Sequence, residues 1–542
     1  MSTTTLESFS MNKALEGYLK KKQVIPSDEE VNRRLQALRI LQTVANRWCM
    51  VCSQKHFGHK IHVSNCAVKI MTTGSYRLGA FNPGSDIDTV IVCPSHLSRT
   101  DFWDNFLPML ESHPEVKDIT PVRDAKVPII KCHIKDIDID ILQAVTSMQY
   151  STESIDVLDD NILEAMDSTC ILSINGVRHA EAILKELPDL TRYQLLLRAV
   201  KQWAKARGIL NNAMGYLNGV SCAIMAAVVA KDNPNALPSV LFAKFFKYWM
   251  DYDFTMPVRL CDTESTAVCA VPEWRVNISR PECMVVLTPI FPAFNSMLRT
   301  KASHLQLIYE EICRANTILE TLTRHSIGSV GKKKYKGLCK AVYSKVFKER
   351  KFFFCYKTFL QISIPTEHSG LMESKMATIV DNLQKYVTPR YSAYDQFHPL
   401  SYGIENPQAN VPTMTYFVGL HIDKDEQKKL IERQANVMLK QRLDITDALS
   451  RMRTESEWMV FNVCENSSLP SFLEVNIEEN PKYHSERAKE EEEATVDEAQ
   501  QKKRTATQME GDVHDSSAKQ IKIENNQVLA RPTISLITRT VS

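Results

Sequence analysis

The chain has 542 residues, too many for one hydrophobic core, so we expect about three or four domains. With 44% hydrophobic and 24% charged residues and a net charge of +2, the composition is that of an ordinary globular protein and indicates no class of partner. Fourteen cysteines without a disulfide framework, and a start without a signal-peptide core, favour reduced thiols in the cytosol or nucleus.

The first predicted element is a long amphipathic helix. Ser27 is a typical N-cap with acidic residues after it, and apolar residues recur at helical spacing over 31–51. Side chains of the types that bind zinc follow at Cys49, Cys52, His56 and His59. These positions also share one face of a continuing helix, and the second ligand pair of a zinc finger is missing. We therefore favour the helix over a zinc site.

Residues 71–93 hold the most informative pattern: a turn at Gly74-Ser75, a Gly/Pro/Asn loop, and an Asp-Ile-Asp that enters an apolar run. Asp86 and Asp88 lie at the mouth of a predicted buried strand, so both side chains lie on one face. Two like charges there are costly to dehydrate unless a cation lies between them. Such a pair suits Mg²⁺ carrying substrate phosphates, to which the turn could lend N–H groups and a hydroxyl. A hairpin with a solvated acidic end explains Asp-x-Asp alone, but not the whole pattern.

Gly-Ser, a ten-residue loop and Asp-Ile-Asp before an apolar strand resemble the nucleotidyltransferase superfamily related to the repair polymerases. The longer pattern, Gly-Ser-Tyr-Arg-Leu-Gly followed by Gly-Ser-Asp-Ile-Asp-Thr, resembles the motif of the eukaryotic nuclear poly(A) polymerases. The resemblance continues in ordered motifs over roughly residues 20–465, which one coincidental motif would not produce.

A second acidic pattern follows a predicted helix over 98–110 and a predicted strand over 122–130. Asp136, Asp138 and Asp140 alternate with isoleucine, which predicts one strand with all three carboxylates on one face. A charged edge strand would also alternate in this way. A two-metal site needs a third carboxylate from a neighbouring strand, and the periodicity leaves open which of the three supplies it. The resemblance implies Asp140, because the family's ligand directly precedes an Ile-Leu pair.

From about residue 151 the pattern is helical. The apolar run 220–230 is too short to span a bilayer and predicts a buried helix. Arg198, Lys201 and Lys205 share a helix face, which taken alone is more typical of a solvated basic surface. By resemblance, Lys201 would instead hold the triphosphate as a point charge. A helix over about 303–323 should close this domain.

The resemblance implies further contacts in the same domain. Together with Gly74 and Ser75, the nucleotide would be bound by Asn212, Gly219 and Val220. The RNA primer would be bound by Asn175 and Lys205. Two positions depart from the family: Thr73 replaces an aromatic residue and Leu210 replaces a tyrosine. Both bear on base stacking, ATP affinity or nucleotide selectivity rather than on the phosphate chemistry.

The C-terminal part starts with a basic connector over 332–351. Strands are predicted over 352–364 and 414–422, with a helix over 371–386 between them. Basic and aromatic residues in strand–helix–strand order suit single-stranded RNA, although aromatic strands are also ordinary core. The family has an RNA-binding domain that resembles an RNA-recognition motif in this place. A following helix carries Lys429, Arg433, Lys440 and Arg442.

The sequence therefore predicts an α+β multidomain protein. A helical segment (1–50) would pack with the middle domain, followed by a mixed-sheet nucleotidyltransferase catalytic domain (51–150) and a helical middle domain (151–328). An RRM-like α/β RNA-binding domain (329–465) and a disordered tail (466–542) would complete the chain. Lys502, Lys503 and Arg504 match a nuclear-import signal.

The resemblance implies a template-independent polynucleotide adenylyltransferase that adds AMP from ATP to RNA 3′ ends. Asp86, Asp88 and Asp140 would be its catalytic carboxylates and hold two Mg²⁺ (or Mn²⁺) ions. Its partners would be ATP, the single-stranded RNA 3′ end and cleavage/polyadenylation factors. The protein would be a monomer that does not associate with a membrane and is found in the nucleus, and in part in the cytoplasm. Two alternatives remain open: a terminal uridylyltransferase-like enzyme and an inactive paralogue that only binds RNA.

Overall fold

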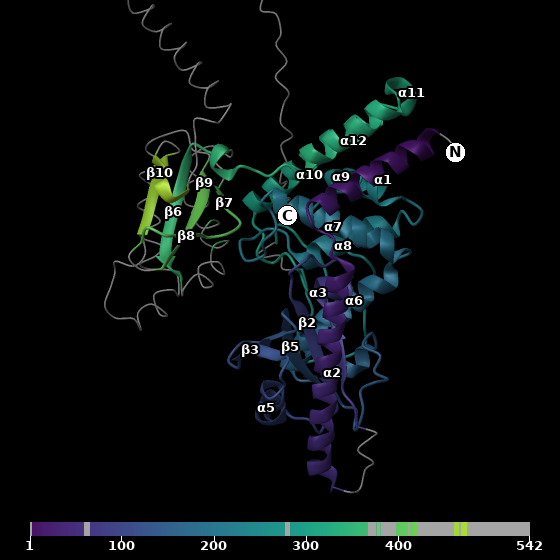
Figure 1. Ribbon diagram of the computed structural model, residues 1–542, viewed down its shortest axis with the longest axis vertical. Coiled ribbons are helices and arrows are strands. Elements are labelled where there is room, and N and C mark those ends of the chain that lie inside the picture. Colours follow the sequence, from purple (N-terminus) through teal and green to yellow (C-terminus); the bar gives the residue numbers. More distant parts are fainter. Residues whose placement is uncertain are drawn as a thin grey trace, which may run out of the picture. The chain divides into compact units, whose positions relative to one another are not determined.

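The computed structural model of the protein (Figure 1) describes residues 3–58, 66–276, 282–366, 397–409, 412–420, 460–465 and 468–473, together with Met376 and Val380. Across these ranges, every helix is too short or too polar to cross a lipid bilayer.

A five-stranded mixed sheet carries the acidic pattern of the sequence. Its strands lie in the order β1 (Lys69–Thr72), β2 (Ile87–Cys93), β5 (Ile137–Val145), β4 (Ile129–Ile134) and β3 (Val116–Val122). β2 and β5 are parallel, and the other neighbouring strands are antiparallel. β2 alternates between two cores: Ile87 and Ile91 belong to one, and Val90 and Val92 belong to the other. Asp88 therefore shares its face with Val90 and Val92.

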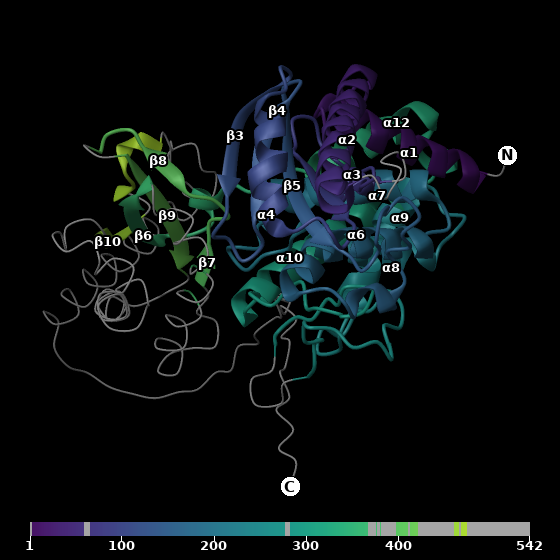
Figure 2. The ribbon, with the colours of Figure 1, turned by 90° about the horizontal axis from the view of Figure 1, so that it is seen from below.

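Helices cover both faces of this sheet (Figure 2). On the Ile87 face lies α2 (Asp28–Phe57), where the Ser27 hydroxyl accepts a hydrogen bond from the Glu30 N–H at 3.3 Å, as the predicted N-cap requires. A second helical segment packs on this face and consists of α4 (Arg99–Asp101), η3 (Phe102–Phe106) and α5 (Leu107–Glu111). The Val90 face is covered by η4 (Asp160–Leu163) and α6 (Ser168–Glu186).

The strand predictions around the second acidic pattern were partly wrong. The predicted strand 122–130 is interrupted, because β3 ends at Val122 and β4 begins at Ile129. Lys135 and Asp136 have φ angles of 51° and 60°, so they form the turn between β4 and β5 instead of continuing one strand. Asp138 and Asp140 do share one face of β5, with the isoleucines buried on the other.

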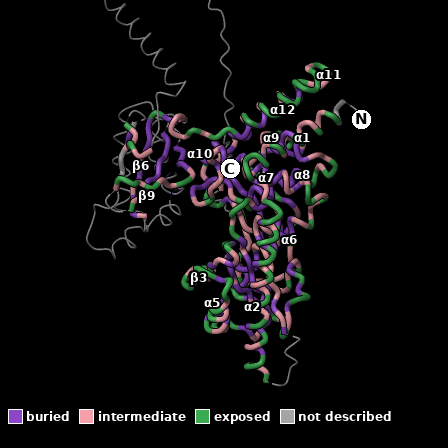
Figure 3. Tube along the Cα trace, viewed as in Figure 1, coloured by how far each residue is buried: buried purple, intermediate pink, exposed green. Residues whose placement is uncertain are grey.

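The helical part is built from α7 (Leu190–Ala206), α8 (Gly219–Lys231), α9 (Pro238–Asp251) and α10 (Ala302–Thr323). Every residue of α8 from Ser221 to Ala230 is buried, which confirms the predicted buried helix. The same core includes Leu15 and Leu19 of α1 (Thr3–Lys21). Figure 3 draws the buried stretches of the chain in purple, and such stretches run through this helical part.

The predicted basic connector is a helix instead. After α11 (Ile327–Val330), α12 (Lys332–Val346) buries Tyr335 and Tyr343 in the helical core while Lys332, Lys333 and Lys334 stay exposed. The apolar and basic residues alternate at helical spacing, which separates them onto two faces.

A second, all-antiparallel sheet follows. Its strands are β10 (Val460–Glu465), β6 (Thr358–Pro365), β9 (Thr413–Leu420) and β7 (Phe397–Pro399), with β8 (Ile404–Asn406) also paired to β9. β6 and β9 confirm most of the two predicted strands, but Phe352–Phe354 form a 3₁₀ turn, η5; a further 3₁₀ turn is η9 (Ser471–Leu473).

Several predicted C-terminal features cannot be compared with the structure. The predicted helix 371–386, apart from Met376 and Val380, lies outside the described residues. So do the helix with Lys429, Arg433, Lys440 and Arg442, the 502–504 basic run, and all of the predicted tail except 468–473. The RRM-like fold and the domain boundaries stay predictions.

Candidate active site

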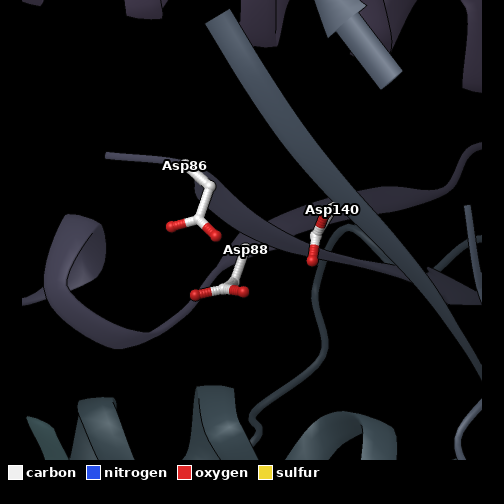
Figure 4. A group of neighbouring side chains, drawn as sticks. All are labelled: Asp86, Asp88 and Asp140. Atoms are coloured by element: carbon white, nitrogen blue, oxygen red, sulfur yellow. The ribbon is translucent and has the colours of Figure 1, made fainter. Parts of the chain in front are cut away.

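Three carboxylates from two strands and a loop meet at the end of the mixed sheet. Asp86 precedes β2, Asp88 lies on it, and Asp140 lies directly opposite Asp88 across the parallel β2–β5 pair. One ligand oxygen from each lies within 4.8 Å of the others, and the three side chains converge (Figure 4). The Thr89 hydroxyl donates to the Asp140 carbonyl at 2.9 Å, which fixes the two strands at this level.

The cluster carries excess negative charge. Burial, which is the largest cause, and the charges of Asp86 and Asp140 together raise the pKa of Asp88 to about 6, while Lys131 acts against this rise. Lys131 lies across from Asp140 on β4, and its Nζ is 3.1 Å from Asp140 Oδ2. Three carboxylates with one lysine leave a net charge that a dication would neutralise. Oxygen-only ligands fit a hard cation such as Mg²⁺ or Mn²⁺.

The backbone at Gly74 lies against this cluster. Gly74 has a φ of +58°, and a Cβ at this position would lie 3.2 Å from Asp88 Oδ2. The Thr73 N–H donates to the Asp88 carbonyl at 3.0 Å, so the turn is fastened to β2. Glycine is required here because a side chain would meet both strain and the carboxylate. The turn continues into α3 (Gly74–Arg77).

A cavity of about 680 Å³ opens beside Asp88, between the turn, α6, α7 and the start of α8. It brings together all the residues predicted to bind the nucleotide, namely Gly74, Ser75, Lys201, Asn212, Gly219 and Val220. A volume of this order is typical of a small-molecule or cofactor site. The cavity therefore joins the acidic cluster to the predicted basic and Gly/Asn-rich motifs, which lie more than a hundred residues later in the chain.

The basic face of α7 is not the solvated surface that its sequence alone suggests. Arg198 Nη2 donates to the Gly79 carbonyl at 2.6 Å, and Lys201 Nζ lies 3.5 Å from the Ala80 carbonyl. Burial lowers the pKa of both side chains. Lys205, one turn further, is exposed and does not line this cavity.

Asn218 organises the α8 end of the cavity. Its side chain accepts from the Ser221 N–H at 2.8 Å and caps α8, while its Nδ2 donates to Asn212 Oδ1 at 3.3 Å and to the Ser296 carbonyl at 2.7 Å. Gly219 and Val220 then form the exposed first turn of the helix.

Asn175 occupies a different position from the other predicted contacts. It is only 4% exposed, and neither its Oδ1 nor its Nδ2 has a partner among the described residues. The neighbouring Gly176 lines the cavity, but Asn175 does not.

A second cavity of about 590 Å³ lies on the other side of the cluster and is lined by Asp86, Asp140 and Lys131. The carboxylates thus separate two cavities, with Asp88 facing the first. Sequence reasoning missed Lys131, because its proximity to Asp140 depends on the β4–β5 register. It also missed His179, which lines the first cavity and has no motif around it.

The Cys/His cluster gives no support for zinc. Cys49 and Cys52 are buried on α2, and burial raises their pKa values to about 12 and about 11, so both stay neutral thiols. Within the described part of the chain, only the aspartate cluster has metal-ligand geometry. His59 lies outside that part.

Two family models match the chain. Residues 1–187 match the poly(A) polymerase nucleotidyltransferase domain, and residues 192–335 match the poly(A) polymerase central domain. The sheet and the acidic cluster lie within the first range. The basic face of α7, α8 and α10 lie within the second.

Curated relatives cover both ranges. A poly(A) polymerase of Dictyostelium discoideum is 31% identical over 423 residues, 76% of this chain and 50% of its own. Poly(A) polymerase pla1 of Schizosaccharomyces pombe is 32% identical (70% of this chain, 66% of its own), and nuclear poly(A) polymerase 1 of Arabidopsis thaliana is 30% identical (69% and 52%). The chain thus spans about half to two thirds of the length of these relatives.

Solved structures are matched more weakly. The structure of Cid1 in complex with its short product ApU covers 65% of this chain and 100% of its own, at 14% identity and a TM-score of 0.39.

Proposed function

Because the chain belongs to the poly(A) polymerase family, we propose that it is a template-independent polynucleotide adenylyltransferase that adds AMP from ATP to the 3′ end of RNA. The observation that carries this proposal is the acidic cluster of Asp86, Asp88 and Asp140 at the mouth of the Lys201 cavity. It combines ligands for a cation with a basic pocket for a triphosphate.

In the proposed reaction, the primer 3′-oxygen forms a bond to the α-phosphorus of ATP. The bond from that phosphorus to the bridging oxygen breaks, and pyrophosphate leaves. Two Mg²⁺ (or Mn²⁺) ions bound by Asp86, Asp88 and Asp140 would supply activation of the hydroxyl and stabilisation of the leaving charge. The remaining contributions come from side chains and backbone around the cavity.

Lys201 and the Gly74-Ser75 turn would orient the triphosphate. Lys201 is half-buried, so its charge acts in a partly desolvated site where it is worth more than on the surface. The missing Cβ at Gly74 lets a phosphate approach the backbone next to Asp88. Asn212, Gly219 and Val220 would bound the nucleoside at the α8 end.

The second sheet, formed by β10, β6, β9, β7 and β8, would take part in binding RNA. We propose that this antiparallel sheet belongs to an RRM-like RNA-binding domain, and that Asn175 and Lys205 contact the primer. The exposed amine of Lys205 is free to meet a phosphate, and the unsatisfied amide of the buried Asn175 offers hydrogen bonds. Nuclear localisation and recruitment by cleavage/polyadenylation factors are proposed from the names and family of the relatives.

The proposal is tested by extension of an oligo(A) primer with each of the four labelled nucleotides in Mg²⁺ or Mn²⁺. We expect incorporation from ATP to exceed that from the other three, and Asp88→Ala to abolish it. Faster incorporation from UTP would favour a uridylyltransferase, the alternative that the ring-free residues Thr73 and Leu210 keep open. Equal, background extension by the wild type and Asp88→Ala would favour an inactive RNA-binding paralogue.

A further inference from the structure

One wall of the nucleotide cavity carries an imidazole that the proposed reaction does not use. Gly176, His179, Ala180 and Ile183 form one face of α6, and all four line the cavity that also holds Lys201 and Asn212. His179 is the only ionisable residue on this α6 stretch of the described cavity wall. It lies one helical turn beyond Gly176 on this face.

The polar edge of His179 lacks a partner. Its Nε2 is shielded from solvent and has no hydrogen-bond partner among the described residues. A shielded polar atom in a native structure is costly unless a ligand or water satisfies it. The residue lines the cavity, but Nε2 itself has almost no accessible surface, so it would reach a bound molecule once the imidazole turns about its side-chain torsion angles.

The ring is neutral at physiological pH. Burial, which is the larger cause, and the charge of the neighbouring Arg178 together lower the pKa of His179 to about 3. A neutral imidazole offers one donor and one acceptor, and it gains little from a phosphate, which prefers a cation. Its chemistry therefore fits the edge of a nucleobase better than it fits the triphosphate.

Phe294 lies across from His179 on the same cavity. The two ring centroids are 6.4 Å apart with an interplanar angle of 72°. Phe294 is held in place by Thr288, whose Oγ1 accepts from the Phe294 N–H at 2.9 Å and whose N–H donates to the Phe294 carbonyl at 3.0 Å. Buried Arg178 donates to the Phe291 carbonyl at 2.9 Å, so α6 is tied to the loop that carries Phe294. These contacts fix the positions of the two rings on one side of the cavity.

The cavity lacks the two aromatic side chains that the family resemblance implies. Thr73 and Leu210 occupy the positions where the family places aromatic residues. Thr73 is buried, and its Oγ1 lies 2.6 Å from where a Cβ on Gly176 would be, so it fills space against α6 and offers no stacking surface. Another aromatic surface is then needed to hold a flat base.

We propose that His179 and Phe294 bind the nucleobase of the incoming nucleotide, with His179 Nε2 hydrogen-bonded to the edge of the base and Phe294 packed against it. This inference rests on the proposed nucleotidyl transfer and adds a base-specificity determinant to it. The roles divide along the cavity: Lys201 and the Gly74 turn bind phosphate, and His179 discriminates between bases.

The test separates the base from the phosphates. Equilibrium binding of ATP and of tripolyphosphate is measured for the wild type, His179→Leu and His179→Gln. We expect His179→Leu to weaken ATP binding about tenfold and His179→Gln to weaken it less, because an amide can still hydrogen-bond. Binding of tripolyphosphate should be unchanged in both. The control is His325→Leu, since the exposed His325 bonds the Thr321 carbonyl and lines neither described cavity.

Primer extension provides the second readout. The ratio of kcat/KM for ATP to that for the other nucleotides should fall about tenfold in His179→Leu, mainly through KM, with kcat retained. An equal loss for ATP and tripolyphosphate, or for all four nucleotides, would mean that His179 only supports the fold and would overturn the inference. Unchanged ATP binding would overturn it as well.

Failure of the proposed function gives a different result. If ATP binds with the His179 dependence but no primer is extended, adenylyl transfer fails while base recognition by His179 holds. Circular dichroism and thermal unfolding of His179→Leu show whether it is folded. If it is not folded, the His179→Gln variant is used for the comparison. Equal affinities of that variant for ATP and for every ATP analogue whose base lacks one edge group would refute a hydrogen bond to the base.

Discussion

Asp88→Asn should stabilise the metal-free protein at neutral pH while it abolishes function. Asp88 is partly buried between two other carboxylates, so its negative charge is unfavourable in the absence of a cation. Asparagine has nearly the same shape but no charge, and therefore removes this cost. The prediction tests whether the cluster is built for a cation rather than for the stability of the fold.

The magnitude follows from the pKa. Burial and the neighbouring carboxylates raise the pKa of Asp88 from 3.8 to about 6. A group with a raised folded pKa binds its proton more tightly in the folded state, so stability falls as pH rises from about 4 to about 6. The full difference corresponds to about 3 kcal/mol, and partial solvation of the side chain reduces this to about 1–2 kcal/mol.

The assay is thermal unfolding of the wild type and Asp88→Asn in EDTA at pH 7.5 and at pH 4. We expect a higher midpoint for the variant at pH 7.5 and equal midpoints at pH 4, where the wild-type carboxyl is already protonated. Mg²⁺ or Mn²⁺ should then raise the wild-type midpoint more than that of the variant. Asp104→Asn, which removes an exposed carboxylate on η3, controls for net charge. A variant no more stable than the wild type in EDTA at pH 7.5 would refute the reasoning.

Three further predictions concern the same site. Lys131→Met removes the cation 3.1 Å from Asp140 and should tighten Mn²⁺ binding several-fold, measured by paramagnetic titration; weaker binding would contradict this. Gly74→Ala should destabilise the protein by about 1–2 kcal/mol because of the left-handed φ and should reduce primer extension, whereas Gly17→Ala, in open space on α1, should do neither. Lys201→Met should raise the KM for ATP about tenfold or more with Mg²⁺ saturating, in steady-state kinetics; a change in kcat alone would argue against a triphosphate contact.

Much of the local structure could be predicted from the sequence. The Ser27 cap, the α2 and α8 helices and strand β2 follow from capping residues, helical spacing and an apolar β-branched run, all of which act between near neighbours. The paired Asp86 and Asp88 follow from the two-residue period of a strand. The family could be named from the same motifs, and the family models match its two domains.

Other features depended on contacts between distant segments. Asp136, Asp138 and Asp140 look equivalent in the sequence, but a hairpin turn removes Asp136 from the strand, and the parallel β2–β5 register sets Asp140 opposite Asp88. Register is set by turns and by burial of the whole sheet, which periodicity alone does not encode.

The basic and aromatic groups of the cavity show the same limit. Arg198 and Lys201 are half-buried because the loop at residues 79–80 packs over α7. The sequence of α7 alone does not predict this contact. His179 belongs to no motif that the sequence reasoning used. Its ring is neutral, and its Nε2 has no partner among the described residues, only because α6 packs against the loop that carries Phe294. The sequence by itself determined the carboxylates and the elements that carry them. The tertiary structure alone decided which groups face them, because desolvation and proximity arise from packing between segments far apart in the chain.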